Sequence, residues 1–332
     1  MGPGHPATGT LFENEVWPPS SRARRVLLTG ARGFVGREVQ RQLLARGCEV
    51  VAVSRNLRAE GILPGVIQVA GDVAASGWQR WCEGCSAAIH LVGIIREVRR
   101  AGATFDHAHR AATERVVQAC RDLGIHRLVH MSALGARKDA ATPYHASKWQ
   151  AEQLVRASGL SWTIFRPSLI FGPGDGTSTV IAPTMRRLPL FPVFGDGNYL
   201  VQPIAVEEVA HCLVAALDLN GTVGETYALG GPEALTFDEL LRRTAAALGI
   251  RRVLVHIPLG LAKFAISLGQ HLPGAPITRD QLTMLLEGST CDTSASSVAF
   301  GVPVKTYQGP VWMGRRGARA AAREDDTDAV EP

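Results

Sequence analysis

Short apolar runs alternate with amphipathic stretches through the first half of the chain. Six runs have the length and composition of buried parallel strands: RVLLTG from Arg25, EVVAVSR from Glu49, VIQVAGD from Val66, AAIHLVG from Ala87, RLVHMSA from Arg127 and WTIFRPSLIFG from Trp162. Between them, FVGREVQRQLLARG and TFDHAHRAATERVVQACRDLG repeat apolar positions at helical spacing. Strands that alternate with helices predict a doubly wound parallel sheet, the Rossmann-type α/β fold.

The strict alternation stops after about Gly172. VQPIAVEEVAHCLVAAL predicts a short strand and a helix, and ETYALGGPEALTFDELLRRTAAALG predicts a strand and a helix that begins at Thr236 and ends at Gly249. VLVHIP, LGLAKFAISLGQHL and TRDQLTMLLEG follow. The change of pattern predicts a domain boundary near Gly172.

Three glycines in TGARGFVG lie between the first predicted strand and the first predicted helix. Gly30 allows a tight turn, Gly33 lets the backbone approach a pyrophosphate, and Gly36 allows close packing of helix and strand. The start of the helix then offers unpaired N–H groups to the phosphates. This context predicts a dinucleotide site.

The end of the second predicted strand bears on which dinucleotide binds. Sites for NAD place an acidic residue there, where it accepts from the ribose 2′-OH. This chain has Ser54 and Arg55 instead, and Arg55, helped by Arg32, is suited to a 2′-phosphate. The alternative is a solvated surface arginine. NADP(H) is therefore favoured over NAD(H), and Asp72, after the third strand, is placed to accept from the adenine amino group.

The string PYHASK sets Tyr144 and Lys148 one helical turn apart, after a proline that favours a helix start at Pro143. A nearby ammonium favours the phenolate, so we expect the pKa of Tyr144 to lie below its usual value of about 10. Such a tyrosine can exchange a proton with a substrate oxygen while hydride moves to or from nicotinamide.

Composition excludes other classes of protein. The 332 residues are 46% hydrophobic and 20% charged, and the net charge of +5 comes from scattered arginines, so neither disorder nor nucleic-acid binding is expected. Six cysteines include one C-x-x-C and no second pair at zinc spacing, and no metal site is expected. No apolar run reaches the roughly 20 residues of a membrane span, and the first residues lack a secretory signal. A cytoplasmic location, with peripheral contact to a membrane as the variant, is expected.

Several strings in fixed order resemble the short-chain dehydrogenase/reductase family of the extended or atypical kind. They are TGARGFVG, GDV, HLVG and YHASK, and HLVGIIRE, HMSALGA, FRPSLIFGPGDG and VQPIAVEEVA further resemble the group of the NADPH-binding accessory subunit of respiratory complex I and its bacterial relatives. The resemblance covers about residues 25–300. It implies Ser132 as the group that orients the substrate oxygen, beside Tyr144 and Lys148, and a small C-terminal substrate cap.

With this resemblance, the expected organisation is a disordered leader (1–24), an NAD(P)-binding domain (25–171), a cap interleaved with the main sheet (172–312) and a disordered tail (313–332). The expected cofactor contacts are Gly30, Arg32, Gly33, Phe34, Val35, Gly36, Ser54, Arg55, Asp72, Val73, Leu91, Val92, Gly93, Tyr144, Lys148, Pro167 and Ser168.

Two departures from the family pattern keep two functions open. Some members carry the hydroxyl one position after Ser132, where this chain has Ala133, and His109 stands where many relatives have asparagine. The leading hypothesis is an NADP(H)-dependent oxidoreductase acting on a carbonyl or hydroxyl group, with an epimerase or dehydratase as a variant on the same site. The alternative is a non-catalytic nucleotide-binding accessory or assembly factor of a respiratory or quinone-related complex. The expected partner is a small-molecule substrate, with quinone-like and apolar compounds among the candidates.

The apolar segment 259–272 also has two interpretations. It packs into the core of the cap, or its side chains Leu261, Phe264 and Leu268 line an apolar pocket or contact a membrane surface. The histidines His90, His107 and His109 are expected at the sheet or the cofactor rim, since no carboxylate or cysteine completes a metal set.

Overall fold

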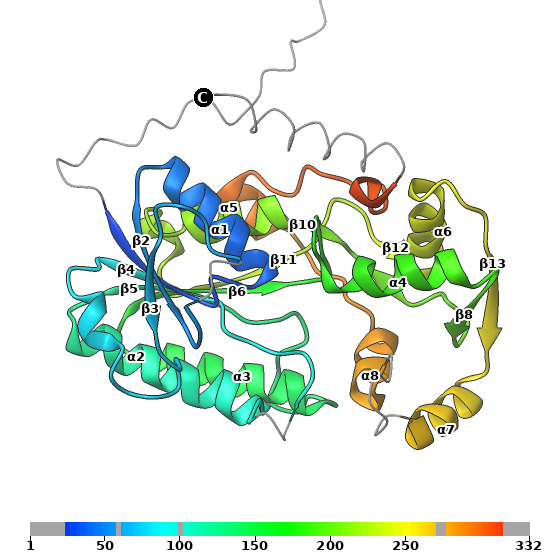
Figure 1. Cartoon of the computed structure of the whole chain (residues 1–332), viewed down its shortest axis with the longest axis horizontal. Coiled ribbons are helices and arrows are strands. Elements are labelled where there is room, and N and C mark those ends of the chain that lie inside the picture. The colour runs from blue at the N-terminus through cyan, green and yellow to red at the C-terminus, as the bar shows by residue number, and fades with distance from the viewer. Residues whose placement is uncertain (1–23, 58–60, 99–101, 270–276, 315–332) are drawn as a thin grey trace, which may run out of the picture.

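The computed structural model describes residues 24–57, 61–98, 102–269 and 277–314 (Figure 1). The leader and tail expected from the sequence lie almost entirely outside these residues.

A seven-stranded sheet confirms the predicted fold class. Its strands are β1 (Arg25–Thr29), β2 (Glu49–Ser54), β3 (Ile67–Ala70), β4 (Ala87–His90), β5 (Arg127–Met131), β6 (Ser161–Pro167) and β11 (Glu225–Leu229). They lie in the order β11-β6-β5-β4-β1-β2-β3, and every neighbouring pair is parallel. Strand order reverses beside β1, between β1 and β4, where nucleotides bind in sheets of this kind.

Helices cover both faces of the sheet (Figure 1). The helices α1 (Phe34–Ala45) and α5 (Val206–Ala215) lie on one face, and α2 (Ala112–Asp122) and α3 (Pro143–Arg156) lie on the other. Two hydrophobic clusters, one on each face, fill the space between helices and sheet. The first includes Phe300 and Val302, so the end of the described chain packs back onto the main core.

The helix that contains Tyr144 begins at Pro143, as predicted. Pro143 occupies the first turn of α3, and the Thr142 side chain accepts a hydrogen bond from the backbone N–H of His145. Gly47 follows α1 with φ of +72°, a left-handed conformation that ends the helix.

The helix before β5 differs from the expected regular one. It begins as a π-helical turn, Asp106–Ala111, before continuing as α2. Such a turn holds one extra residue, and turns of this kind are frequent at functional sites. It carries both His107 and His109.

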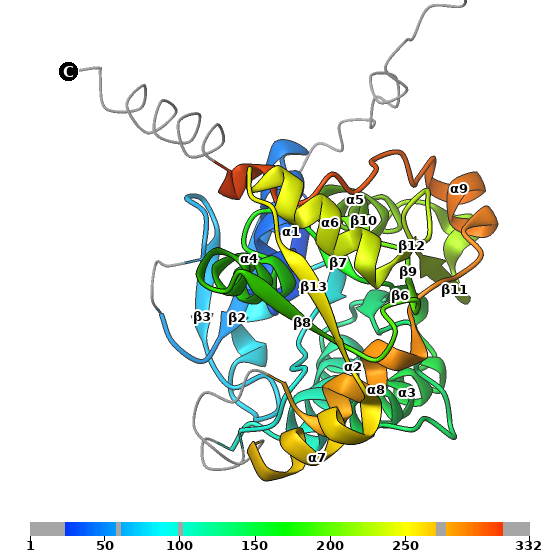
Figure 2. The same ribbon diagram turned by 90° about the vertical axis from the view of Figure 1, so that its right-hand side faces the viewer.

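The second part of the chain builds a smaller layered unit, on the right of Figure 1 and facing the viewer in Figure 2. Its longer elements are α4 (Gly176–Arg187), β8 (Leu190–Phe194), α6 (Phe237–Ala247), β13 (Val253–Ile257), α7 (Leu259–Gly269) and α8 (Arg279–Glu287), while α9 (Ser294–Phe300) packs back against α5 and β11 of the main sheet. Two pairs of short strands also form, β7 (Ile170–Phe171) with β10 (Ile204–Ala205) and β9 (Leu200–Val201) with β12 (Leu235–Thr236). Single 3₁₀ turns lie at Asn220–Thr222 and Val311–Met313, and another lies in the first part of the chain at Gln79–Cys82. A third hydrophobic cluster, between α4, β8 and α6, forms its core.

No helix in the described part of the chain is long and apolar enough to cross a membrane.

Candidate functional site

A cavity of about 560 Å³ opens at the carboxyl ends of β1, β2, β3 and β4. This is the edge where ligands bind in parallel α/β sheets. Ten predicted cofactor contacts line it: Gly30, Arg32, Gly33, Ser54, Arg55, Asp72, Val73, Leu91, Val92 and Gly93. Sequence reasoning missed Arg37, Asn56 and Ile94, among others, which line the same cavity, and His107, expected at the sheet or the cofactor rim, lines it as well.

The glycine turn has the geometry of a nucleotide cradle. Gly30 adopts φ of +77°, and a β carbon there would come within 2.8 Å of the Leu91 carbonyl carbon. A β carbon on Gly36 would lie 2.2 Å from the Gly30 oxygen, so only glycine lets α1 approach the turn this closely. No side chain in the described residues caps the start of α1 at Gly33. The first N–H groups of the helix therefore remain available to phosphate at the cavity.

Three arginines give one side of the cavity a positive charge. Arg32, Arg37 and Arg55 line it, and the Arg32 guanidinium donates to the Asn56 carbonyl at 3.2 Å. The Ser54 hydroxyl donates to the same carbonyl at 3.0 Å, which fixes the turn after β2. Arg37 directly follows Gly36, so its position beside the phosphate cradle was available from the sequence.

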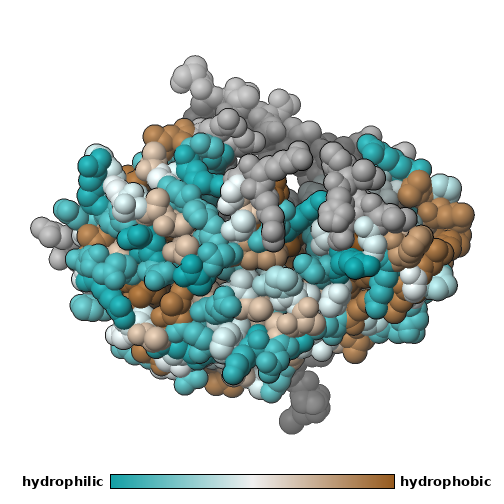
Figure 3. Space-filling view, turned by 90° about the horizontal axis from the view of Figure 1, so that it is seen from below, coloured by the Kyte–Doolittle hydropathy of each residue, from teal (hydrophilic) through white to brown (hydrophobic). Residues whose placement is uncertain are grey.

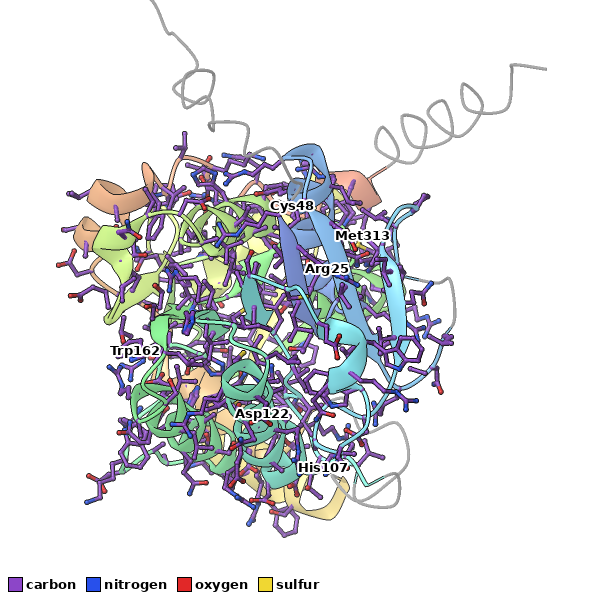
Figure 4. The ribbon with its side chains drawn as sticks, turned by 90° about the vertical axis from the view of Figure 1, so that its left-hand side faces the viewer. Arg25, Cys48, His107, Asp122, Trp162 and Met313 are labelled. Carbon is purple, nitrogen blue, oxygen red and sulfur yellow. The ribbon has the colours of Figure 1, made fainter. Side chains whose placement is uncertain are left out.

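Asp72 is the one carboxylate that lines this cavity in the described residues, and it has a partner. His107 Nε2 lies 2.9 Å from the Oδ2 atom of Asp72, and both residues line the cavity. His107 is labelled in Figure 4. Partial burial works to raise the pKa of Asp72, but hydrogen bonds from His107 and the Ala74 N–H outweigh it and lower the pKa. Asp72 is therefore an ionised acceptor. The Asp72–His107 contact could not be predicted from the sequence, because the two residues are 35 positions apart and His107 lies in the π-helical turn.

Lys148 lies buried beside the inner edge of the cavity. Its ammonium donates to the Met131 carbonyl, at the end of β5, over 3.2 Å. A β carbon on Gly93, a cavity residue, would lie 2.8 Å from the Lys148 Nζ. Burial lowers the pKa of Lys148 to about 8, although the negative charge of Glu152 opposes the shift.

Tyr144 packs among three other rings at the start of α3. The ring centroids of Phe105, His109 and His145 lie 5.9, 5.6 and 5.2 Å from its own. Burial raises the pKa of Tyr144 to about 12. The expected lowering of this pKa by Lys148 is wrong, because the cost of placing a phenolate among apolar rings exceeds any attraction to the ammonium.

Ser132 follows β5 directly, next to Met131, whose carbonyl binds Lys148. Its side chain is buried, and its hydroxyl has no hydrogen-bond partner in the described part of the chain. An unpaired buried hydroxyl is costly unless something binds it, which fits a group that awaits a substrate oxygen.

The other seven predicted contacts do not line the cavity: Phe34, Val35, Gly36, Tyr144, Lys148, Pro167 and Ser168. Val35 is buried in the main core, Phe34 packs beside Gly172, and Pro167 pairs with Leu229 at the end of β6. The Ser168 hydroxyl is hydrogen-bonded to Ser289, at 2.8 Å from its carbonyl and 2.7 Å from its hydroxyl. Ser168 therefore ties the two parts of the fold together.

His109 connects several parts of this site. Its Nε2 accepts from the Ile94 N–H at 3.1 Å, and its Nδ1 lies 2.8 Å from the Ser147 hydroxyl. The acceptor role of Nε2 places the proton on Nδ1 of a neutral ring. Burial and the nearby charge of Lys148 lower the pKa of His109 to about 2, so it stays neutral.

Two further histidines, His90 and His130, are buried near Lys148. His90 and His130 stack with centroids 5.3 Å apart, and His90 is held between the hydroxyls of Thr29 at 2.6 Å and Thr113 at 3.1 Å. Both pKa values are lowered, first by burial and then by neighbouring charges that include Lys148. These rings therefore stay neutral. Within the described residues no group of three metal-ligating side chains forms.

Comparison with known proteins gives consistent results. Residues 26–230 match the NAD dependent epimerase/dehydratase family. The chain is 31% identical to 2-alkyl-3-oxoalkanoate reductase of Stenotrophomonas maltophilia over 263 residues, 69% of this chain and 77% of that protein. It is 29% identical to the NADH dehydrogenase [ubiquinone] 1 alpha subcomplex subunit 9 of Arabidopsis thaliana, covering 64% of this chain but only 54% of the plant subunit. The structure of MoeE5 in complex with UDP-glucose and NAD superposes with a TM-score of 0.67 at 22% identity, covering 90% of this chain and 99% of that one.

Proposed function

The chain belongs to the NAD-dependent epimerase/dehydratase family, and we propose that it is an NADP(H)-dependent reductase that uses Tyr144 to protonate a carbonyl oxygen. An NAD(P)-dependent oxidoreductase-type activity follows from the family and its reductase relatives. The observation that supports the finer proposal is that the Lys148 ammonium lies beside Gly93, which lines the glycine-built cavity, and that Tyr144 precedes Lys148 by one turn of α3. The bound cofactor would supply hydride to the carbonyl carbon.

The state of the tyrosine favours reduction over oxidation. With a pKa of about 12, Tyr144 stays protonated at neutral pH and is ready to donate. Oxidation of an alcohol would need the phenolate as a base, and burial works against that form. Lys148, with a pKa of about 8, is mostly an ammonium at neutral pH, and it offsets the charge that develops on the phenol oxygen as the proton leaves.

Ser132 and His109 would complete the site in different ways. The unpaired hydroxyl of Ser132 is suited to hold the substrate oxygen near Tyr144. His109 is a positioning residue, since its ring packs against Tyr144 and is fixed by Ile94 and Ser147. It replaces the asparagine of many relatives without adding a charge.

The preference for NADP(H) is supported by charge. Arg32 and Arg55 line the part of the cavity after β2, and the only carboxylate lining the described cavity, Asp72, is engaged by His107. A 2′-phosphate would find charge-assisted donors there, whereas a free 2′-hydroxyl would find no acidic acceptor at the end of β2.

The substrate class we propose is an apolar compound with a ketone, such as a 3-oxo acid with an alkyl chain. The bacterial relative acts, by its name, on a 2-alkyl-3-oxoalkanoate. The rings of Phe105 and Tyr144 would face such a substrate with apolar surface.

The test is a screen for NADPH oxidation with alkyl 3-oxo acids, simple ketones and quinones, followed by Tyr144→Phe. We expect this variant to lower turnover of any substrate by about 10²–10⁴-fold with little change in NADPH affinity, because it removes only the proton donor. The matched control is Tyr227→Phe, a tyrosine of β11 outside the cavity. Full activity in Tyr144→Phe would remove this residue from the mechanism.

A second candidate function is that of a nucleotide-binding accessory subunit. The likeness to a complex I subunit favours it, although the alignment spans about half of the plant protein. If it is correct, Tyr144→Phe should bind NADPH and support its complex normally, and no substrate in the screen should be reduced. Affinity purification of the tagged chain from cells would separate the two candidates. Co-purification of a respiratory complex would favour the accessory role, and purification of the chain alone would favour the reductase.

A further inference from the structure

The outer face of the β8–β13 sheet is apolar along its whole length. The two strands pair in parallel, so Leu190, Pro192 and Phe194 share a face with Val253, Val255 and Ile257. The opposite face carries Phe191 and Val193 into the core against α4 and α6. Leu190 is 57% exposed and Val253 is 61% exposed. A sheet face open to water is normally polar, so this exposed apolar face indicates a surface that binds another molecule or a membrane.

Helix α7 extends the same apolar side. It follows β13 directly, and Leu261 and Phe264, one turn apart, are 60% and 64% exposed. Ala262 and Ile266 point inward and are buried, so the fold already has its core contacts from this helix. Figure 2 looks onto this side, where β13 leads into α7, and Figure 3 shows hydrophobic residues gathered at the same end of the molecule. We call Leu188, Leu190, Val253, Val255, Leu261 and Phe264 the β8–α7 surface.

The segments that build this surface carry cations and no carboxylates, although Asp196 follows β8 and Asp238 pairs with His256 of β13. The segments 176–195 and 240–269, which build it, contain no aspartate or glutamate. They contribute Arg186 and Arg187 before β8, Arg251 and Arg252 before β13, and Lys263 on α7. Among the described residues, none of these five forms an ion pair with a carboxylate. Arg186 and Arg252 instead donate to backbone carbonyls, which leaves their charge uncompensated.

We propose that the β8–α7 surface docks the protein on an anionic lipid bilayer. Exposed apolar side chains between unpaired cations match the two layers of such a bilayer, the acyl chains and the negative headgroups. Lys263 is exposed on α7, and its long side chain can reach the headgroups while Leu261 and Phe264 enter the apolar layer.

The same charges argue against a second copy of this chain as the occupant. A two-fold dimer brings the same patch of both subunits together. The five cations would then face five cations across the interface, with no carboxylate from these segments to compensate them. An anionic surface removes this repulsion.

The proposal is independent of the catalytic role of Tyr144, since no residue of the β8–α7 surface lines the nucleotide cavity. It can fail while the reductase function stands, and the reverse also holds. If both are correct, docking would bring an apolar substrate dissolved in the bilayer to the enzyme.

The experiment is flotation of the full chain with vesicles of phosphatidylcholine alone or with about 30% phosphatidylglycerol. We expect at least about tenfold stronger binding to the anionic vesicles, which weakens as salt is raised. Leu261→Asp/Phe264→Asp should abolish binding, while Val298→Asp, at an exposed valine of α9, should leave it unchanged. Arg251→Ala/Lys263→Ala should weaken binding by about tenfold or more, and Arg46→Ala/Arg80→Ala, which removes the same charge elsewhere, should not.

Three results would overturn the proposal. The first is equal affinity for neutral and anionic vesicles, and the second is no binding to either. The third is a dimer in light scattering that Val253→Asp dissociates, since this would assign the surface to a second copy. Circular dichroism and the melting temperature of each variant establish that it is folded.

Discussion

The two ends of the nucleotide site use charge in opposite ways. At the Arg55 end, Arg32, Arg55 and the Asp72–His107 pair lie at the cavity rim, where charges are solvated. At the Lys148 end, an ammonium and three neutral histidines are buried beside the partly exposed Tyr144, and desolvation shifts their pKa values strongly. The first end is therefore suited to binding a fixed negative charge, while under the proposed mechanism the second end controls where a proton resides.

The largest effect is expected at the buried end. Lys148→Met should lower kcat/KM by about 10²-fold or more, because the developing phenolate loses its counter-charge. In the wild type, Lys148 loses its proton as the pH rises through about 8. Reductive kcat/KM should therefore fall above that pH, and a pH–rate profile measures the limb. A profile that stays flat to pH 10 would contradict the assigned role of the lysine.

A smaller effect is expected at the exposed end. Arg55→Asp should weaken NADPH binding by at least about tenfold, because a carboxylate replaces a charge-assisted donor to the 2′-phosphate. NADH affinity should change much less, and calorimetry with both cofactors gives the comparison. Arg46→Asp, an exposed arginine after α1 and outside the cavity, is the control. Equal affinity of the wild type for both cofactors would contradict the proposed preference.

The smallest effect is expected at His107. Its removal in His107→Ala should weaken both cofactors about equally and by only a few-fold, since Asp72 stays ionised and a partly exposed pair contributes little. Fluorescence titration of NADPH and NADH measures this. A loss confined to NADPH would instead mean that His107 contacts the 2′-phosphate.

Much of the nucleotide site could be predicted from the sequence. The role of Gly30, Gly33 and Gly36 follows from the tight turn and close packing that glycine allows. Because they lie between a strand and a helix, the edge of the sheet that they occupy also follows. Arg37 was missed although it adjoins Gly36. His107 and Asp72 are 35 residues apart in the chain, and only the π-helical turn brings their side chains together.

The α/β class, the parallel sheet and the glycine turn at the nucleotide site could be predicted from the sequence, because periodicity and glycine conformation act over a few residues. The protonation states around Tyr144 and Lys148 could not be predicted in this way. Neighbours in sequence predict a lowered tyrosine pKa, but Phe105 and His109, from another helix, enclose the phenol and raise it to about 12. Desolvation depends on everything that surrounds a group, and that is set by packing between distant segments rather than by spacing along the chain.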